Sequence, residues 1–251
     1  MKRSFRNTFY AVALSTVIFS GCSKKEDVVA DPTTNTPSTS NSTPSIKDGY
    51  GSFAAVHSVS YTTIAGITVP LDVNTAVAAF YSSPGTTSLI DGGTVTLNTK
   101  SLTRSSNNAY SYQNLTDPLS FNQVAWSVSG SSGVPAINYT DDKSFPDYSG
   151  YNSLPSTLTK ANGLIVSLGG SISNADSVYV IVSGGDKYLL KRFAGNASQC
   201  TFSASELSVI GNTTFGMIQV APWNYKKEDF NSKSYYFVLE TCYTKQGVTI
   251  N

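Results

Sequence analysis

The sequence predicts an all-β protein. From Tyr50 onward, apolar residues recur with a period of two in short runs, which is the pattern of half-buried strands. Gly, Asn, Asp, Ser and Pro separate these runs, as they do at turns between strands. The chain also has 15 Tyr, 12 Phe and 2 Trp and almost no helical periodicity. We therefore expect β-sandwich architecture.

The strand pattern can be placed segment by segment along the chain. It fits residues 53–62, 76–81, 94–98, 109–113, 124–128, 164–168, 177–182, 188–193, 200–203, 215–221 and 235–243. Hairpin signals are Asp91-Gly92-Gly93, Asn107-Asn108 and Gly184-Gly185-Asp186. One capping box, from Ser203 to Glu206, predicts a helical turn or two and no long helix.

A loop-rich stretch over residues 141–150 lies at the midpoint of the strand-forming region. The region is long enough for one large sandwich or for two smaller ones. We favour two immunoglobulin-like sandwiches, over residues 49–145 and 146–251.

The N-terminus has the pattern of an export signal. Lys2, Arg3 and Arg6 precede an apolar run over residues 9–19, which is too short to span a bilayer. We expect residues 1–21 to be a signal peptide. Residues 31–45 lack any large apolar side chain, so residues 22–48 should form a disordered tether.

The end of this signal is similar to a known motif. Ile18-Phe19-Ser20-Gly21-Cys22 resembles the lipobox of bacterial lipoproteins, although Phe19 stands where leucine is usual. The resemblance implies cleavage before Cys22 and acylation of that residue, which would anchor the protein in a membrane. Residues 23–27, four of which are charged, resemble the charged tetrad that sends lipoproteins of the Bacteroidota to the outer face of the outer membrane. A periplasm-facing anchor is the alternative.

Composition limits the classes of binding partner and predicts the state of the cysteines. Residues 1–21 hold three of the 17 Lys/Arg and none of the 16 Asp/Glu, so the mature chain is nearly neutral and nucleic acid is a poor partner. Cys200 and Cys242 are the cysteines left after the anchor. In an exported protein they are expected to form a disulfide, with two buried thiols as the alternative.

The second half of the chain carries a looser resemblance. The segments 178–182, 201–207 and 216–222 are similar to those of immunoglobulin-like modules in surface proteins of the Bacteroidota. The resemblance implies a spacer or adhesive role. Such modules have no catalytic residues to carry over.

Catalytic motifs are missing from the sequence. His57 is the one histidine, which excludes Ser-His-Asp triads and multi-histidine metal sites, and His57 with Met217 is a poor basis for haem ligation. No nucleotide-binding glycine motif is present, so we expect no cofactor. Asp141, Asp142 and Asp147 form the densest acidic group, which could be a solvated loop, a calcium site or, least of all, the carboxylates of a hydrolase.

Aromatic side chains give the better binding hypothesis. Trp223 and Tyr225 lie in the segment 222–231, which follows a strand and should be a loop at one end of a sandwich. Flat rings there could stack on a sugar or anchor a protein, unless Trp223 folds back over the core. We therefore expect a non-enzymatic, lipid-anchored surface protein that acts as an adhesive, scaffolding or binding module. The alternative is a glycan-binding lipoprotein that uses Trp223 and Tyr225.

Overall fold

The structure, a computed structural model, describes residues 48–64 and 67–251 and confirms the all-β prediction. Its strands are β1 (Gly51–Ile64), β2 (Ile67–Phe80), β3 (Val95–Leu97), β4 (Lys100–Ser101), β5 (Thr103–Arg104), β6 (Tyr110–Tyr112), β7 (Ala125–Val128), β8 (Ile137–Thr140), β9 (Asp147–Tyr148), β10 (Thr157–Leu158), β11 (Leu164–Ser167), β12 (Ile172–Ser173), β13 (Ser177–Gly184), β14 (Lys187–Ala194), β15 (Gln199–Phe202), β16 (Thr213–Phe230) and β17 (Lys233–Ile250). The helical elements are α1 (Ala204–Leu207), η2 (Tyr151–Ser153) and η3 (Lys160–Asn162).

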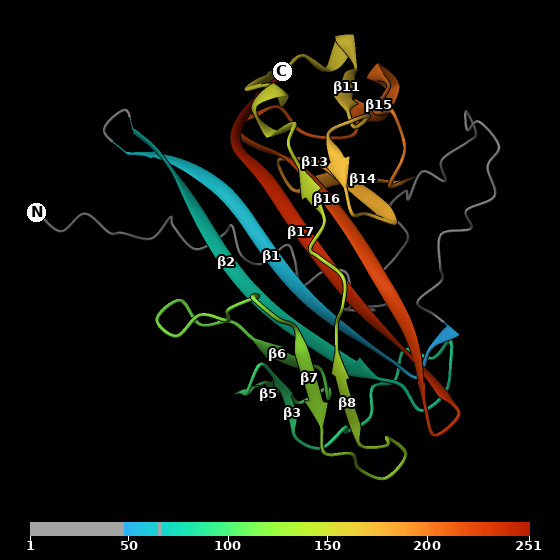
Figure 1. Cartoon of the computed structure of the whole chain (residues 1–251). Coiled ribbons are helices and arrows are strands. Elements are labelled where there is room, and N and C mark those ends of the chain that lie inside the picture. Colours follow the sequence, from blue (N-terminus) through green and yellow to red (C-terminus); the bar gives the residue numbers. More distant parts are fainter. Residues whose placement is uncertain (1–47, 65–66) are drawn as a thin grey trace, which may run out of the picture.

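One nine-stranded sheet organises the described chain. Its order is β14-β13-β16-β17-β1-β2-β6-β5, and β10 also pairs with β17. Strand β1 is parallel to β17 and antiparallel to β2. A four-stranded sheet, β4-β3-β7-β8, and the pairs β11-β15 and β12-β9 complete the fold. Figure 1 shows β16 and β17 running past both the β3-β7-β8 region and the β11-β15 region.

The long strands β16 and β17 change the predicted domain division. Strand β1, from the predicted first sandwich, pairs with β17, from the predicted second one, over Gly51↔Tyr235 to Ser60↔Thr244. Residues 49–145 and 146–251 therefore do not form separate sheets. The predicted strand 215–221 also ended too early, because Pro222 cannot donate to a ladder, whereas β16 continues to Phe230. In the structure, neither Ala221 nor Pro222 has a partner in the β16-β17 register, and the pairing resumes without a shift at Trp223↔Glu240.

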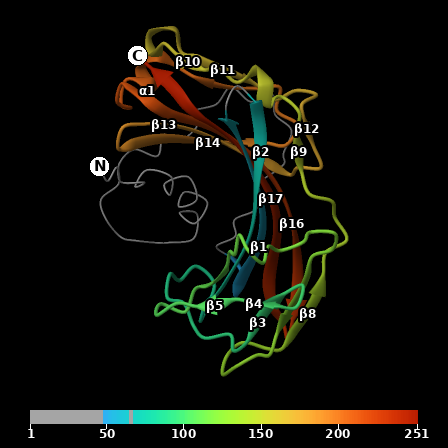
Figure 2. The same ribbon diagram turned by 90° about the vertical axis from the view of Figure 1, so that its left-hand side faces the viewer.

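Two hydrophobic cores lie on the same face of this sheet. The first core includes Phe53, Trp126 and Phe237, under the four-stranded sheet. The second core includes Val180, Val220 and side chains of the β11-β15 pair. Figure 2 shows the long sheet bent, with the smaller sheets on its convex side.

The two cores are connected through the middle of β16 and β17. The predicted loop over residues 141–150 is hydrogen-bonded to the sheet at this point. The buried Thr241 hydroxyl donates to the Pro146 carbonyl at 2.6 Å. The Asn224 amide donates to the carbonyls of Ser144, at 3.0 Å, and Asn174, at 2.7 Å. The segment that joins the two halves is therefore hydrogen-bonded to the sheet that they share.

A third cluster lies on the opposite face of the sheet, and we call it the concave-face cluster. Side chains alternate across a strand: on β16, Ile218 and Val220 belong to the second core, whereas Ala221 and Trp223 belong to the third cluster. Its buried members are Ala54, Val56, Ala221, Trp223, Val238 and Cys242, and Val77, Tyr179 and Tyr225 pack against them.

This arrangement corrects the expected disulfide. Cys200 and Cys242 are both buried and free. Cys200 belongs to the second core and Cys242 to the concave-face cluster, so the sheet lies between them. Burial raises the pKa of the Cys200 thiol to about 12 and that of Cys242 well above its ordinary value. Both cysteines therefore pack as small apolar side chains, which was the alternative interpretation.

Two local sequence signals are confirmed. The Ser203 backbone N–H donates to Glu206 Oε2 at 2.7 Å, and the Glu206 N–H donates to Ser203 Oγ at 3.3 Å, which completes the capping box of α1. The predicted hairpin joins β13 to β14 with Gly184↔Lys187 as its last pair. Gly185, in the turn, has a φ of +68°, a conformation that favours glycine.

Candidate functional site

A polar groove lies on the outer face of the four-stranded sheet. Val95, Leu97, Trp126, Val128 and Ile137 point from this sheet into the first core. Because side chains alternate along a strand, the residues between them point outward. Thr96, Ser127 and Asn138 lie side by side in this outer row, since Thr96 pairs with Ser127 and Ser127 pairs with Asn138.

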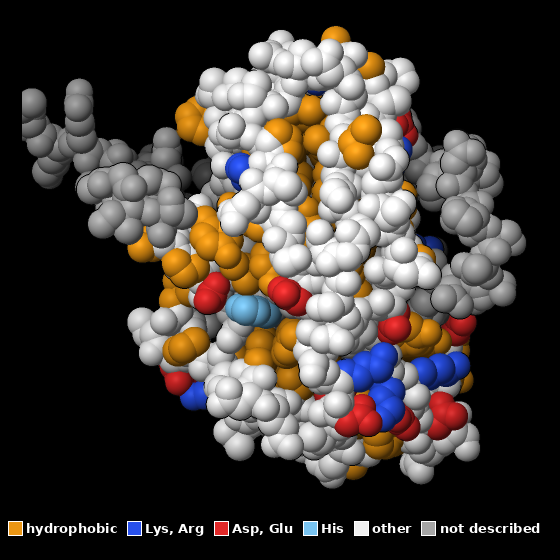
Figure 3. Space-filling view, turned by 45° about the horizontal axis from the view of Figure 1, so that its top comes forward, with side chains coloured by type: hydrophobic (Ala, Val, Ile, Leu, Met, Phe, Trp, Pro, Cys, Tyr) orange, Lys and Arg blue, Asp and Glu red, His pale blue; other side chains and the backbone are white. Residues whose placement is uncertain are grey.

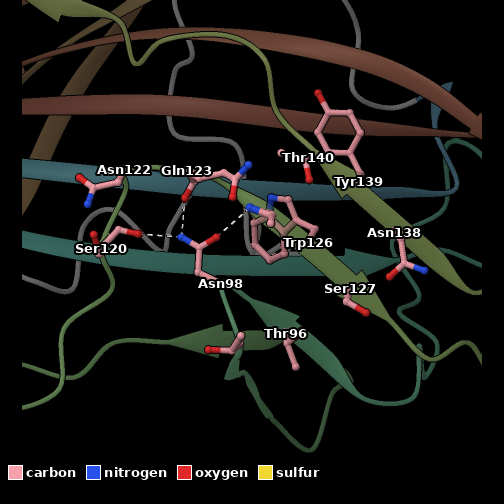
Figure 4. Close-up of a pocket in the computed structure, with 12 residues that line it drawn as sticks. Thr96, Asn98, Ser120, Asn122, Gln123, Trp126, Ser127, Asn138, Tyr139 and Thr140 are labelled. Carbon is pink, nitrogen blue, oxygen red and sulfur yellow. Dashed lines mark hydrogen bonds between the residues drawn. The ribbon is translucent and has the colours of Figure 1, made fainter.

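Asn98 holds in place the loop before β7, which forms one wall of the groove. Asn98 follows β3 with a φ of +46°, a left-handed conformation that Asn tolerates. Its side-chain amide donates to the carbonyls of Ser120, at 2.6 Å, and Gln123, and its Oδ1 accepts from the Ala125 N–H at 2.8 Å. These bonds hold the loop before β7 against the end of β3 (Figure 4).

The groove has a volume of about 650 Å³. The side chains that point outward into it carry mainly amides and hydroxyls, whereas the rings of Trp126 and Tyr139 pack in or against the first core. The lining comprises Thr96, Asn98, Thr99, Ser120, Asn122, Gln123, Ala125, Trp126, Ser127, Asn138, Tyr139 and Thr140. None of these described residues is Asp, Glu, His, Lys or Arg. Amides and hydroxyls both donate and accept hydrogen bonds without carrying charge. The groove can therefore bind a neutral, hydroxyl-rich molecule, and its described lining contains no carboxylate or imidazole.

The expected aromatic platform is not a loop and is not on the surface. Trp223 and Tyr225 lie inside β16, and Trp223 is 2% exposed. Their ring centroids are 6.0 Å apart with 51° between the planes, so the rings are not coplanar. The alternative interpretation, in which Trp223 packs against the core, agrees better with the structure.

The three carboxylates of the acidic group have separate partners. Asp142 pairs with Lys226 at 3.1 Å, and Asp147 accepts from the Tyr243 hydroxyl. Asp141 is partly buried, which raises its pKa, and accepts from the Lys143 N–H at 2.9 Å. In Figure 3 the basic and acidic side chains of this face gather mainly in one cluster of mixed sign. In residues 48–64 and 67–251 no group of three or more His, Cys, Asp or Glu side chains could hold a metal ion.

His57 and Met217 lie on opposite faces of the sheet. His57 shares the face of β1 that carries Phe53 and Ala55 of the first core, and its Nε2 lies 3.9 Å from Asp72 Oδ1. Met217 alternates with Ile218 of the second core and so points to the concave side. They cannot ligate one group together.

The groove and one buried acid were missed by sequence reasoning. Thr96, Ser127 and Asn138 come from three strands whose register no single segment reveals. Glu240 could have been noticed as the one charged residue in the apolar run 235–243. The structure buries it to 7% exposure on the concave side of β17.

The N-terminal predictions, including the lipidated Cys22, lie outside the described residues. Among the helices of the described part, none has the length and apolar character needed to traverse a bilayer. Comparison of the chain with protein-family models, with curated proteins and with solved structures gives no match.

Proposed function

We propose that this protein is an exported, lipid-anchored binding module of the cell surface, and that its outer groove binds a neutral glycan. The observation that carries the proposal is the charge-free lining of that groove, in which hydroxyl and amide groups from three neighbouring strands and one loop converge. A glycan presents many hydroxyls that can exchange hydrogen bonds with such groups.

A binding role fits the site better than catalysis does. General acid–base chemistry needs a titratable side chain within hydrogen-bond reach of the ligand, and the described lining contains no carboxylate or imidazole. The adhesive role implied by the resemblance to immunoglobulin-like surface modules belongs to the same proposal, and its support is the all-β architecture. The proposed site is thus the outer sheet face and not the segment around Trp223.

Loss of groove side chains should weaken glycan binding. Asn138 and Thr140 are exposed, so replacing both by alanine removes polar contacts without opening a cavity. We expect about tenfold weaker binding of a neutral oligosaccharide selected on a glycan array, since one or two hydrogen bonds contribute roughly 1–2 kcal/mol.

The matched control for this measurement is Asn212→Ala, an exposed asparagine outside the groove, which should bind like the unmodified protein. An array that yields no neutral glycan, or equal affinity in the groove variant and the control, would reject the groove as a glycan site.

The anchor has an independent test. Replacing Cys22 by serine removes the sulfur that would receive the lipid, so the protein should move from the membrane pellet to the soluble fraction of fractionated cells. Metabolic labelling with a fatty acid should mark the unmodified protein and not the variant. Labelling of both, or an unchanged membrane fraction, would contradict lipidation at Cys22.

A further inference from the structure

Three polar side chains form a row across the concave face of the long sheet. Ser177 on β13 pairs with Trp223 on β16, and Trp223 pairs with Glu240 on β17. Directly opposed residues on neighbouring strands have Cβ atoms about 5 Å apart. The three side chains therefore follow one another on the same side of the sheet, among the apolar residues of the concave-face cluster.

This row lacks the partners that buried polar groups normally have. Within residues 48–64 and 67–251, the Ser177 hydroxyl and the Trp223 indole N–H have no hydrogen-bond partner, and both atoms are buried. In the described part of the chain, Glu240 accepts one hydrogen bond, from the Cys242 thiol at 3.3 Å, and no ion pair includes it. An unpaired carboxylate in an apolar setting is costly. Burial accordingly raises the pKa of Glu240 to about 7.

Aromatic rings lie next to the middle of the row, at Trp223. The Trp223 ring lies 5.7 Å from Tyr179, nearly parallel at 16°, and 6.0 Å from Tyr225. Tyr225 in turn lies 5.9 Å from Tyr236. Tyr179 and Tyr225 are half-buried and stand on either side of the enclosed Trp223. Lys143 and Lys227 lie 5.9 Å and 5.6 Å from the Tyr225 and Tyr236 rings, which is within the range of a cation–π interaction.

The row and the rings together define the chemistry of a ligand. The Glu240 carboxylate has no positively charged partner among the described residues, and the faces of aromatic rings attract cations. The indole N–H can only donate, so it needs an acceptor such as an oxygen. We propose that the concave face binds an organic ammonium group that carries a nearby hydroxyl, with Glu240 facing the cation and Trp223 donating to the oxygen. This site lies on the opposite face of the protein from the glycan groove and does not depend on it.

Choline and its uncharged analogue 3,3-dimethyl-1-butanol provide a matched pair of probes, because they share a shape and a hydroxyl and differ in charge. The protein has two tryptophans, and a Trp223→Phe variant identifies the indole N–H resonance of Trp223 in an NMR spectrum. We expect choline to shift that resonance and to bind about tenfold more tightly than the alcohol, a preference of the size that cation–π and charge pairing provide.

Glu240→Gln should remove the preference for choline, because it keeps the shape of the side chain and deletes its charge. Asp186→Asn, in the exposed β13-β14 turn, removes a charge elsewhere and should keep the preference. The Trp126 resonance, from the first core, should not move in either case. Equal affinities for the two probes, no shift with either probe, or an undiminished preference in folded Glu240→Gln would overturn the proposal.

Discussion

Replacing Phe53 by alanine should lower the free energy of unfolding by about 3–5 kcal/mol, the usual range for truncating a fully buried phenylalanine. Phe53 is 0% exposed. Its ring stacks on Phe237 at 4.7 Å and lies 5.1 Å from Trp126 and 5.4 Å from Phe80. These three neighbours come from β17, the four-stranded sheet and β2. Removal of the ring therefore leaves a cavity where three parts of the fold meet, which small shifts of one strand cannot fill.

The measurement is urea denaturation followed by circular dichroism and by tryptophan fluorescence. Phe215→Ala is the matched control, because Phe215 is 89% exposed and its truncation should change stability by no more than about 0.5 kcal/mol. A Phe53→Ala loss as small as that of the control would mean that the first core is not packed as described.

Much of the local structure could be predicted because it depends on neighbouring residues. The period of two identified most of the longer strands, but not β8 or the first part of β2. The Ser203 to Glu206 spacing identified the helix cap, and the turn at Gly185 identified a hairpin. Each of these signals acts within a few residues of the chain. The ends of strands were harder to predict from the sequence. Proline usually ends a strand, but β16 continues past Pro222 because Pro222 lies at a gap in the β16-β17 pairing, which is visible only in the folded sheet.

Long-range pairing was not accessible from the sequence. The parallel contact of β1 with β17 joins residues at opposite ends of the described chain, and no local signal encodes it. The same limit applies to both candidate sites. Thr96, Ser127 and Asn138 become one surface, and Ser177, Trp223 and Glu240 one row, only through strand register. The expected Cys200–Cys242 disulfide was wrong for the same reason, since the face of each strand decides which side chains can meet.

Replacing Glu240 by glutamine should change how stability depends on pH. Burial raises the pKa of Glu240 from its ordinary 4.5 to about 7 in the folded protein. Below pH 4.5 the carboxyl is protonated in both the folded and the unfolded chain. Between pH 4.5 and 7 the unfolded chain releases this proton while the folded chain keeps it, so the free energy of unfolding falls. Above pH 7 the loss is complete, at about 3 kcal/mol.

Glutamine cannot ionise, so Glu240→Gln should lack this loss. Its free energy of unfolding relative to the unmodified protein should rise by about 3 kcal/mol from pH 4.5 to pH 8, measured by urea denaturation at each pH. The difference between the two proteins isolates Glu240, because every other titrating group is common to both. Parallel pH profiles would show that Glu240 is paired or solvated in solution. Choline provides a second comparison. A cation held beside Glu240 favours the ionised carboxyl, so saturating choline should raise the free energy of unfolding of the unmodified protein above pH 7. The stability of Glu240→Gln should stay unchanged.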